Sequence, residues 1–393
     1  MLRRLLIVAV FFTFCKVEPS PIGRIILEEL QALLILSSMP YIGSIKARFL
    51  MHHYGSAAAV LQIPPEEISA LPGFGPKILQ GWKKNLHDRA WEQNLSLIEK
   101  LQADIIPFNS PRYPKRLLDI ADFPLILYVQ GQLLKDEDQR SLAVVGTRQA
   151  SVYGYEIAKQ ISQQLTRAGF TIISGLARGI DTAAHQGALE SEGGRTIAVL
   201  GSGLSRLYPT ENAALAKKIC HSGALISEFS MATPPDKQNF PQRNRIVSAM
   251  GVLGTILIEA PEHSGAMLTA RLAHEQGRPV YAFPGRIDQE TFKGNHRLIK
   301  EKKAELIENV EDVLNRFRNC PLPLKFKENQ KSSIPLEKEE EDLIERLPIQ
   351  EASIEELMLQ TNYPIARLNS LLMSLVLKKR VKEYPGKIYK KIN

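Results

Sequence analysis

The segment from about residue 140 to residue 315 alternates short, almost wholly apolar runs with longer amphipathic stretches. This alternation constrains the fold more than any other feature. The runs predict strands at 142–145, 171–174, 196–200, 224–227, 255–258 and 280–283. Runs that are apolar throughout are typical of strands buried on both faces of a parallel sheet, and a helical pattern follows each run. We therefore predict an α/β domain over residues 108–316, with an extended Rossmann-like, doubly wound parallel sheet.

Helical periodicity dominates residues 21–107, which carry two short glycine-containing turns at 40–43 and 71–77. The second turn, LPGFGPK, has the form of a helix-hairpin-helix, in which glycines let backbone N–H groups approach a DNA phosphate. A tight turn between packed helices that contacts no DNA fits the same residues equally well. We predict a helical domain of the helix-hairpin-helix/SAM-like kind and leave its DNA contact open.

The C-terminal part of the chain predicts a linker and a small domain. Residues 317–335 mix Pro, Lys, Asn and Ser with little periodicity, as a linker does. Within residues 336–393, helices are expected at 337–347, 354–360 and 365–377, the second of them opening with the capping box Ser353-x-x-Glu356. Two alternating runs around Pro385-Gly386 then predict a hairpin. Three helices and a hairpin indicate a winged-helix domain.

The first 20 residues form a leader that we exclude from the fold. Arg3-Arg4 and the apolar residues 5–12 resemble the start of a signal peptide, but the run is too short to span a bilayer and no small-x-small cleavage site follows. We favour a disordered leader or a mis-called start codon over export. The three cysteines, Cys15, Cys220 and Cys320, are too far apart for a CxxC motif. We therefore expect a reduced, cytoplasmic protein without membrane association or metal site.

The charge balance favours an anionic partner. Fifty Lys and Arg residues against 42 Asp and Glu residues give a net charge of +8. Nucleic acid is one such partner, although many basic proteins bind none.

Two predicted strands end in loops that combine glycine with arginine. Gly146 and Arg148 follow the first strand, and Ser174, Gly175 and Arg178 follow the second. An open α/β sheet binds its ligands at the carboxyl ends of its strands, where a glycine lets the backbone approach an anion and an arginine can pair with it. Each loop alone also fits an ordinary tight turn; together they indicate a phosphate-binding site.

The stretch from Lys237 to Arg245 adds basic groups around an aromatic ring. Lys237, Arg243 and Arg245 can contact phosphates, and Phe240 can stack on an unpaired base. Burial of Phe240 in the core is the alternative. The remaining candidates are Asn244, which can bond a base edge or a loop carbonyl, and Gly265 and Thr269, which lie where a further helix begins after the 255–258 strand.

No cofactor is expected. The GxGxxG dinucleotide fingerprint is absent, and no acidic residue lies about 20 positions after Gly146 to hold a ribose hydroxyl.

Five motifs in order carry a family resemblance: VGTR at 145–148, SGLARGID at 174–181 with AHQGAL at 184–189, FPQRNRIVS at 240–248, SGAMLTA at 264–270, and AFPG at 282–285. Together they resemble the motif set of the DNA-processing DprA/Smf family. The resemblance is dense over about residues 105–315. One departure lies at 300–304, where the sequence KEKKA replaces the family's short Gly-Ala turn.

The resemblance implies a single-stranded DNA-binding protein that protects incoming DNA and loads the RecA recombinase during natural transformation. It also implies a homodimer formed through the Rossmann-like domain. Position by position, it implies a DNA pocket formed by Arg148, Arg178, Lys237, Phe240, Asn244 and Arg245.

Binding without catalysis is the expected chemistry. Acids near the motifs are few, namely Asp181, Glu228 and Glu259, and Asp181 at a helix start fits a cap better than a general base. The alternative is a phosphoribohydrolase-like enzyme on a related Rossmann-like scaffold, for which Gly254-Thr255 and Glu259 offer a faint match without the usual double-glycine turn. A third hypothesis makes the basic C-terminal domain the main reader of DNA.

Overall fold

The computed structural model describes residues 21–86, 90–134, 138, 140–317, 336–348, 352–361, 363–378, 380–384 and 386–391. The predicted leader, 1–20, and residues 318–335 of the predicted linker lie outside this part. The chain divides into two compact units, residues 1–326 and residues 327–393. Each unit has its own hydrophobic core.

Helices open the first unit, as the sequence predicts. They are α2 (Pro21–Ser37), α3 (Ser44–Tyr54), α4 (Ala57–Gln62), α5 (Pro65–Ala70), α6 (Pro76–Leu86) and α7 (Ala90–Leu101). The two glycine-containing turns join α2 to α3 and α5 to α6, and each buries one apolar side chain, Ile42 in the first and Phe74 in the second. Within the described part of the chain, no helix is both long and apolar enough to cross a membrane.

A nine-stranded sheet forms the centre of the first unit, in the order β1-β2-β6-β5-β4-β3-β7-β8-β9. The strands from β6 to β9 are parallel, whereas β1 and β2 are antiparallel to their neighbours. Their bounds are β1 (Asp104–Pro107), β2 (Ile126–Gly131), β3 (Ser141–Val145), β4 (Thr171–Ser174), β5 (Thr196–Val199), β6 (Ala224–Ser227), β7 (Thr255–Leu257), β8 (Val280–Ala282) and β9 (Glu305–Leu306).

All six strands expected from the sequence are present, and the predicted Rossmann-like parallel sheet is confirmed, with two antiparallel strands added at one edge. The sequence did not predict β1, β2 and β9. Two of these strands are too short to give a strand pattern. β9 has only two residues, and β1 has two apolar residues and begins three residues after the end of α7. Lys302, which precedes β9 in the atypical 300–304 loop, adopts φ 55, a conformation that favours glycine.

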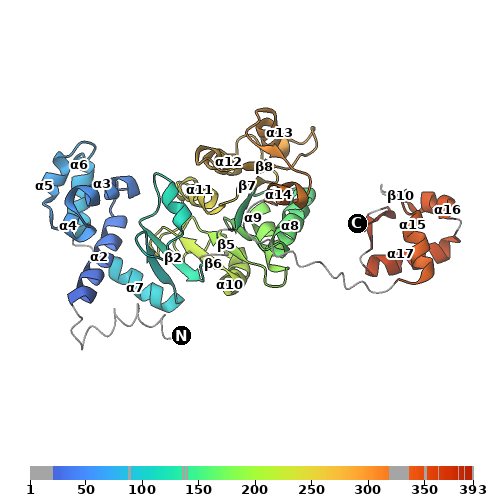
Figure 1. The fold of residues 1–393 in the computed structure, drawn as a ribbon, viewed down its shortest axis with the longest axis horizontal. Helices are drawn as coiled ribbons and strands as arrows, with labels where there is room; N and C mark the ends of the chain where they lie inside the picture. The colour runs from blue at the N-terminus through green and yellow to red at the C-terminus, as the bar shows by residue number, and fades with distance from the viewer. Residues whose placement is uncertain are drawn as a thin grey trace. The chain divides into compact units, whose positions relative to one another are not determined.

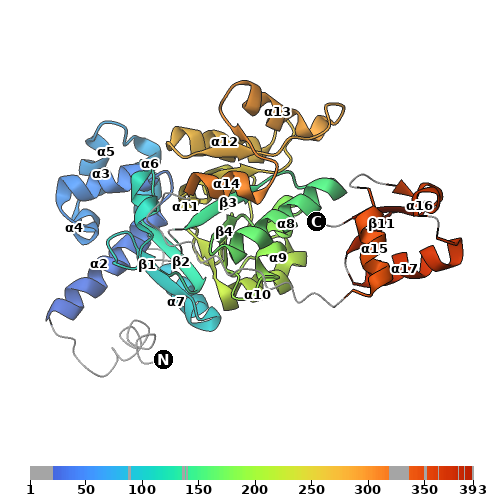
Figure 2. The ribbon, with the colours of Figure 1, turned by 45° about the vertical axis from the view of Figure 1, so that its right-hand side comes forward.

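Helices cover both faces of the sheet, as Figures 1 and 2 show. Alternate residues of β3 point to opposite faces: Leu142 and Val144 pack with α8 and α9, whereas Ala143 and Val145 pack with α11 and α12. The helices are α8 (Val152–Arg167), α9 (Ile180–Leu189), α10 (Ala213–Ser222), α11 (Asn239–Met250), α12 (Gly265–Glu275), α13 (Lys293–Lys300) and α14 (Val310–Phe317), with short 3-10 turns at Lys115–Asp119, Thr210–Asn212 and Glu290–Phe292. The sheet is therefore doubly wound.

The second unit has the elements of a winged helix. They are α15 (Lys338–Arg346), β10 (Ala352–Ser353), α16 (Ile354–Thr361), α17 (Ile365–Leu377), β11 (Val381–Tyr384) and β12 (Ile388–Lys391). The predicted capping box is formed: the Glu356 carboxylate accepts from the Ser353 amide at 2.8 Å, and the Ser353 hydroxyl accepts from the Glu356 amide at 3.3 Å. Pro385 in the predicted hairpin turn lies outside the described residues.

Candidate nucleic-acid interface

The sheet reverses its winding at β3. This strand pairs with β4 on one side and with β7 on the other, so the connections that leave β3 and β7 run to opposite faces. Such a switch point opens a crevice at the carboxyl ends of the strands. A cavity of about 650 Å³ lies there, and we call it the strand-end cavity. Nine of the twelve residues predicted from the sequence line it: Gly146, Arg148, Gly175, Lys237, Phe240, Arg243, Asn244, Gly265 and Thr269.

The two strand-end glycines allow close packing below the cavity. A Cβ on Gly146 would lie 2.5 Å from the Ile180 side chain and 2.9 Å from the Glu259 carbonyl oxygen. A Cβ on Gly175 would overlap the Arg243 guanidinium. Both loops therefore need glycine for packing, whatever binds above them.

Arg243 supplies a positive charge to the floor of the cavity. Its side chain is buried, and its guanidinium donates to the carbonyl oxygens of Gly175, at 2.7 Å, and Val199. Burial lowers the pKa of Arg243 to about 10, while the nearby Asp181 carboxylate acts in the opposite direction. The group stays charged at neutral pH and adds to the positive potential of the cavity.

Asp181 holds the loop after β4. Its carboxylate accepts the backbone N–H groups of Gly175, at 3.1 Å, and Ala177, at 3.3 Å. Burial raises its pKa. The N-cap position of α9 is Gly179, so Asp181 lies in the first turn and bonds the loop rather than its own helix. The cap expected from the sequence is thus replaced by a loop contact.

Arg148 and Lys237 are the exposed cations of the cavity. The Arg148 guanidinium lies 4.8 Å from the centre of the Phe240 ring. Because both side chains are exposed, they can move to meet a phosphate at little cost in packing.

Phe240 lines the cavity and is half-buried. A Cβ on Gly201 would lie 2.6 Å from its ring, so the ring rests against the loop that follows β5. The hydrophobic clusters of the described residues do not include Phe240. This placement fits a stacking surface better than the alternative of a core residue.

The far wall of the cavity is the beginning of α12. The Ser264 hydroxyl caps this helix by accepting from the Met267 amide, and Thr269 donates to the Gly265 carbonyl at 3.2 Å. The side-chain amide of Asn244 donates to the same carbonyl, also at 3.2 Å. Of the two partners expected for Asn244, a base edge or a loop carbonyl, the structure shows the carbonyl.

Two predicted residues lie beside the cavity rather than in its lining. Ser174 is buried, and its hydroxyl donates to the Val144 carbonyl at 2.7 Å. Arg178 is exposed and forms a two-pronged ion pair with Glu211, one arm of which measures 3.0 Å. Ser174 is therefore a strand contact, and Arg178 is an arginine that already has a carboxylate partner.

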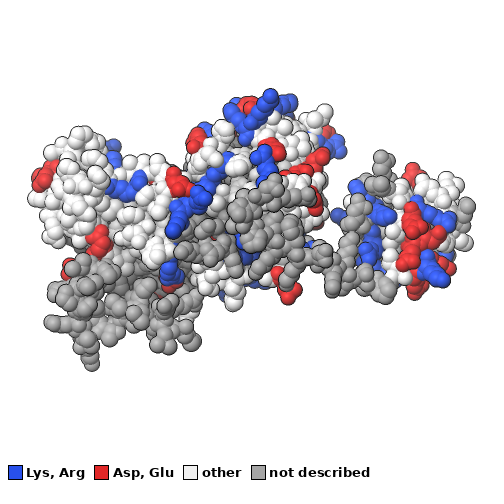
Figure 3. Space-filling model, viewed as in Figure 1, with Lys and Arg blue, Asp and Glu red and all other residues white. Residues whose placement is uncertain are grey.

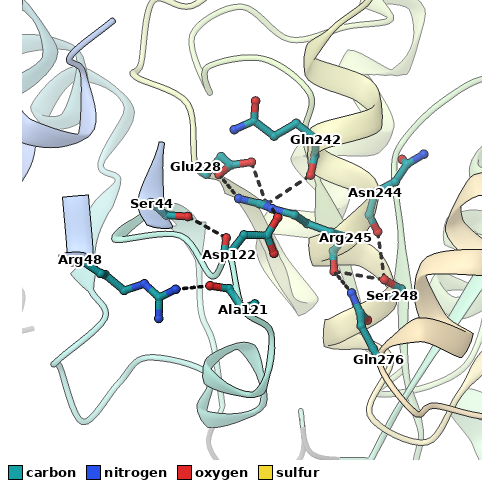
Figure 4. Close-up of polar contacts among 10 residues, drawn as sticks. All are labelled: Ser44, Arg48, Ala121, Asp122, Glu228, Gln242, Asn244, Arg245, Ser248 and Gln276. Atoms are coloured by element: carbon teal, nitrogen blue, oxygen red, sulfur yellow. Dashed lines mark hydrogen bonds and ion pairs between the residues drawn. The ribbon is translucent and has the colours of Figure 1, made fainter. Parts of the chain in front are cut away.

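Arg245 also lies outside the cavity, in an ionic cluster with Glu228 and Asp122 (Figure 4). Its guanidinium bonds Glu228 at 2.6 and 3.0 Å and Asp122 at 2.9 Å. The side chains of Arg245 and Glu228 are only 7% and 9% exposed. Burial is the first influence on the pKa of Glu228 and raises it, while Arg245 opposes that rise.

The Arg245 cluster reaches the helical part of the unit. Ser44 at the start of α3 donates to the Asp122 carbonyl at 3.0 Å, and Arg48 in the same helix donates to the Ala121 carbonyl. Figure 4 shows these contacts converging from α3 and α11 on the 121–122 loop. Arg245 thus connects α11 to the helices that precede the sheet.

Several residues that line the cavity were not among the predicted site residues, although three of them lie within the quoted motifs. Thr147, Gln149, Asp181, His263 and Ser264 also line the cavity. Tyr208 lies next to Phe240, with ring centres 5.9 Å apart. The loop that follows β5 brings Tyr208 to the site.

Glu259, the acid of the alternative enzymatic hypothesis, does not line the strand-end cavity. It is fully buried, and one of its oxygens accepts from the Ser151 amide at 3.0 Å and the Ser151 hydroxyl at 2.7 Å. The carboxylate therefore holds the start of α8. Among the described residues, no group of three or more His, Cys, Asp or Glu side chains is placed to hold a metal.

Comparisons with known proteins agree with this architecture. Residues 104–318 match the model of the family described as DNA recombination-mediator protein A, and residues 327–387 match the DprA winged helix domain. The chain belongs to the DprA/Smf family.

Two relatives in the DprA/Smf family are similar over more than half of this chain. Protein Smf of Escherichia coli is 41% identical over 58% of this chain, and the match spans 63% of that relative. Protein Smf of Synechocystis is 34% identical over 73% of this chain and 72% of the relative. The match to the first relative thus leaves more than a third of its length uncovered.

Two solved structures of the family are similar to the chain. The X-ray structure of DprA from Streptococcus pneumoniae has a TM-score of 0.61 and 31% identity, and covers 73% of this chain and 97% of that one. The second structure, of DprA from Helicobacter pylori, has a TM-score of 0.50 and 29% identity, and covers 55% of this chain and 95% of that one. That structure gives insight into the single-stranded DNA binding mode of the Helicobacter protein.

Proposed function

We propose that the strand-end cavity binds single-stranded DNA. The observation that carries the proposal is the half-buried Phe240 ring, which lines the cavity together with the exposed Arg148 and Lys237. An aromatic face stacks on a base, and the two cations pair with the phosphates that flank it. Base faces are free in a single strand and covered in a duplex, so this combination favours the single strand.

Seven more of the predicted residues have supporting roles in this proposal. Arg243 supplies buried positive charge, and Gly146, Gly175, Gly265 and Thr269 form the walls. Asn244 holds the α12 loop against α11, and Arg245 fixes α11 itself through Glu228 and Asp122. We therefore propose Arg245 as a positioning residue rather than a DNA contact.

Family membership supports a wider role. We propose that the protein protects incoming DNA and loads RecA recombinase during natural transformation, in the cytoplasm, as a homodimer formed through the sheet-bearing domain. The proposed domains keep the predicted bounds: a helical domain at 21–107, a DNA-binding domain at 108–316, a linker at 317–335 and a winged helix at 336–393. Two bounds need a small correction, because β1 (Asp104–Pro107) belongs to the sheet and Phe317 to α14.

Binding rather than catalysis is part of the proposal. Two carboxylates near the cavity make structural contacts: Asp181 bonds two loop amides, and one oxygen of Glu259 bonds Ser151. A general base has to reach the substrate and accept its proton. Asp181 already accepts two backbone N–H groups, and Glu259 does not line the cavity. The phosphoribohydrolase-like alternative therefore has no observation in its favour.

The hypothesis that the second unit is the main DNA reader has less support. Helix α17 carries one basic side chain, Arg367, and this side chain pairs with Glu339 of α15. Lys378 likewise pairs with Glu340, at 2.6 Å. Basic and acidic side chains lie side by side on the face of this unit seen in Figure 3. Phosphate contact would have to compete with these carboxylates.

Arg148→Ala combined with Lys237→Ala tests the proposed cation pair. We expect weaker binding of every single-stranded sequence. The slope of log affinity against log salt concentration should become shallower by about 1.4, because each phosphate contact on a single strand contributes about 0.7 to that slope. The affinity of fluorescent oligothymidylate is measured by anisotropy at several salt concentrations.

The matched control replaces Arg271 and Arg286, whose side chains are 68% and 74% exposed and lie outside the cavity. It changes the net charge equally. If the two double variants weaken binding to the same extent, the cavity is not the site.

A further inference from the structure

The loop that follows β5 brings a second aromatic ring to the strand-end cavity. The ring of Tyr208 lies 5.9 Å from that of Phe240, centre to centre, at an interplanar angle of 48°. Tyr208 is half-buried, and the hydrophobic clusters of the described residues do not include it. Its position beside the cavity thus has no explanation in core packing.

Both rings are accompanied by an arginine. The Arg148 guanidinium lies 4.8 Å from the centre of Phe240, and the Arg178 guanidinium lies 5.8 Å from the centre of Tyr208. The four side chains line one small hollow beside the strand-end cavity, and Arg148 and Phe240 line both. We call the series Arg148, Phe240, Tyr208, Arg178 the planar row, because each member offers a flat face to a base.

From this row we infer that Tyr208 is a second base-stacking residue, so that the site holds two unpaired bases, one on Phe240 and one on Tyr208. The inference rests on the proposed single-stranded DNA binding. A single base cannot stack between the two rings, because their 5.9 Å separation is less than two van der Waals layers, roughly 7 Å. Each ring therefore takes its own base, on the face that its arginine now covers.

Arg178 is the group that changes partner when DNA binds. It is paired with Glu211, and both side chains are 51% exposed. An exposed ion pair contributes little to stability, so a phosphate can replace Glu211 at small cost. The guanidinium then leaves the Tyr208 ring to the incoming base. Glu211 in this scheme competes with the DNA backbone for Arg178.

Stacking is measured with 2-aminopurine, whose fluorescence falls when it stacks. Oligothymidylates carrying this base at one position or at two adjacent positions are bound to the full chain. We expect quenching at two adjacent positions in the natural protein. Tyr208→Leu, which keeps an apolar side chain without a flat face, should remove quenching at one of them, and Phe240→Leu at the other. Tyr208→Phe should retain both.

The same variants predict affinities. Tyr208→Leu should weaken binding of oligothymidylate roughly 5- to 150-fold, the loss expected for one stacked base, and Tyr208→Phe should bind within about twofold of the natural protein. Tyr153→Leu is the matched control, because Tyr153 is 51% exposed and does not line the cavity. Thermal melting of each variant shows whether it is folded.

Two results would overturn the inference while leaving the proposed function standing. One is Tyr208→Leu that is folded and binds as tightly as the natural protein, with quenching unchanged. The other result concerns the exchange of partners by Arg178. Glu211→Gln frees Arg178 and should raise the affinity, so a Glu211→Gln variant that binds no more tightly than the natural protein would overturn this step. A natural protein that binds no single-stranded DNA refutes the proposed function itself.

Discussion

Arg243 and Arg245 have different surroundings although they stand two positions apart on α11. Residues at this spacing lie on different sides of a helix, so they could not both face one ligand. Arg243 lies in the floor of the strand-end cavity, whereas Arg245 pairs with Glu228 and Asp122. The motif FPQRNR predicts basic groups near DNA, but it does not say which side of α11 faces the cavity. That depends on how the helix packs on the sheet.

Arg245→Leu tests its positioning role. The change leaves Glu228 buried without its partner, which should lower the free energy of unfolding by about 3–5 kcal/mol. Chemical denaturation at neutral pH measures this loss. Glu228→Leu in the same chain should recover most of it, because no charge then remains buried alone.

The affinity of the folded variant separates the two roles of Arg245. A positioning role predicts that Arg245→Leu, once stabilised by Glu228→Leu, binds single-stranded DNA nearly as well as the natural protein. A direct phosphate contact predicts instead a shallower salt dependence with unchanged stability, and that outcome would contradict the present assignment.

At the scale of elements, the six parallel strands from β3 to β8 were predictable, because each is a short apolar run with a helix after it. The antiparallel pair β1 and β2 was not, since β1 begins three residues after α7 and shows no alternation long enough to read. The cavity was predictable in outline, because glycine and arginine follow two strand ends. Tyr208 was not, since its role depends on the path of a long loop after β5.

Glu340 in α15 provides a test within the winged helix. Burial favours a higher pKa for its carboxyl, but hydrogen bonds from Lys378, Ser374 and the Glu337 amide outweigh this and lower the pKa to about 2. A lowered folded-state pKa stabilises the fold above the unfolded value, about 4.3, and this contribution disappears as the pH falls towards 2.

Glu340→Gln should therefore destabilise the second unit at pH 7, by roughly 1–3 kcal/mol, as expected for hydrogen bonds to a charged group. Between pH 5 and pH 2 the difference from the natural protein should shrink. Hydrogen exchange of amides in α15 and α17 of the full chain measures both quantities. A difference that stays constant over this pH range would show that the ion pair does not hold these helices.

At the scale of the whole molecule, the chain divides into residues 1–326 and 327–393, and the strand-end cavity belongs wholly to the first. The cavity is formed by loops after β3, β4 and β7 together with α11 and α12, so the first unit contains every residue that we propose to contact DNA. The account therefore assigns single-strand binding to one unit. The second unit can then add affinity for DNA or bind a partner of its own.

The most direct test compares the full chain with residues 1–326. Both are titrated with a single-stranded oligonucleotide and with the duplex of the same sequence, under the same salt conditions. The account predicts that both proteins bind the single strand more tightly than the duplex, and that Phe240→Leu, which removes the stacking surface, removes this preference. The account would be contradicted if the protein of residues 1–326 were folded and bound neither form of DNA while the full chain bound it.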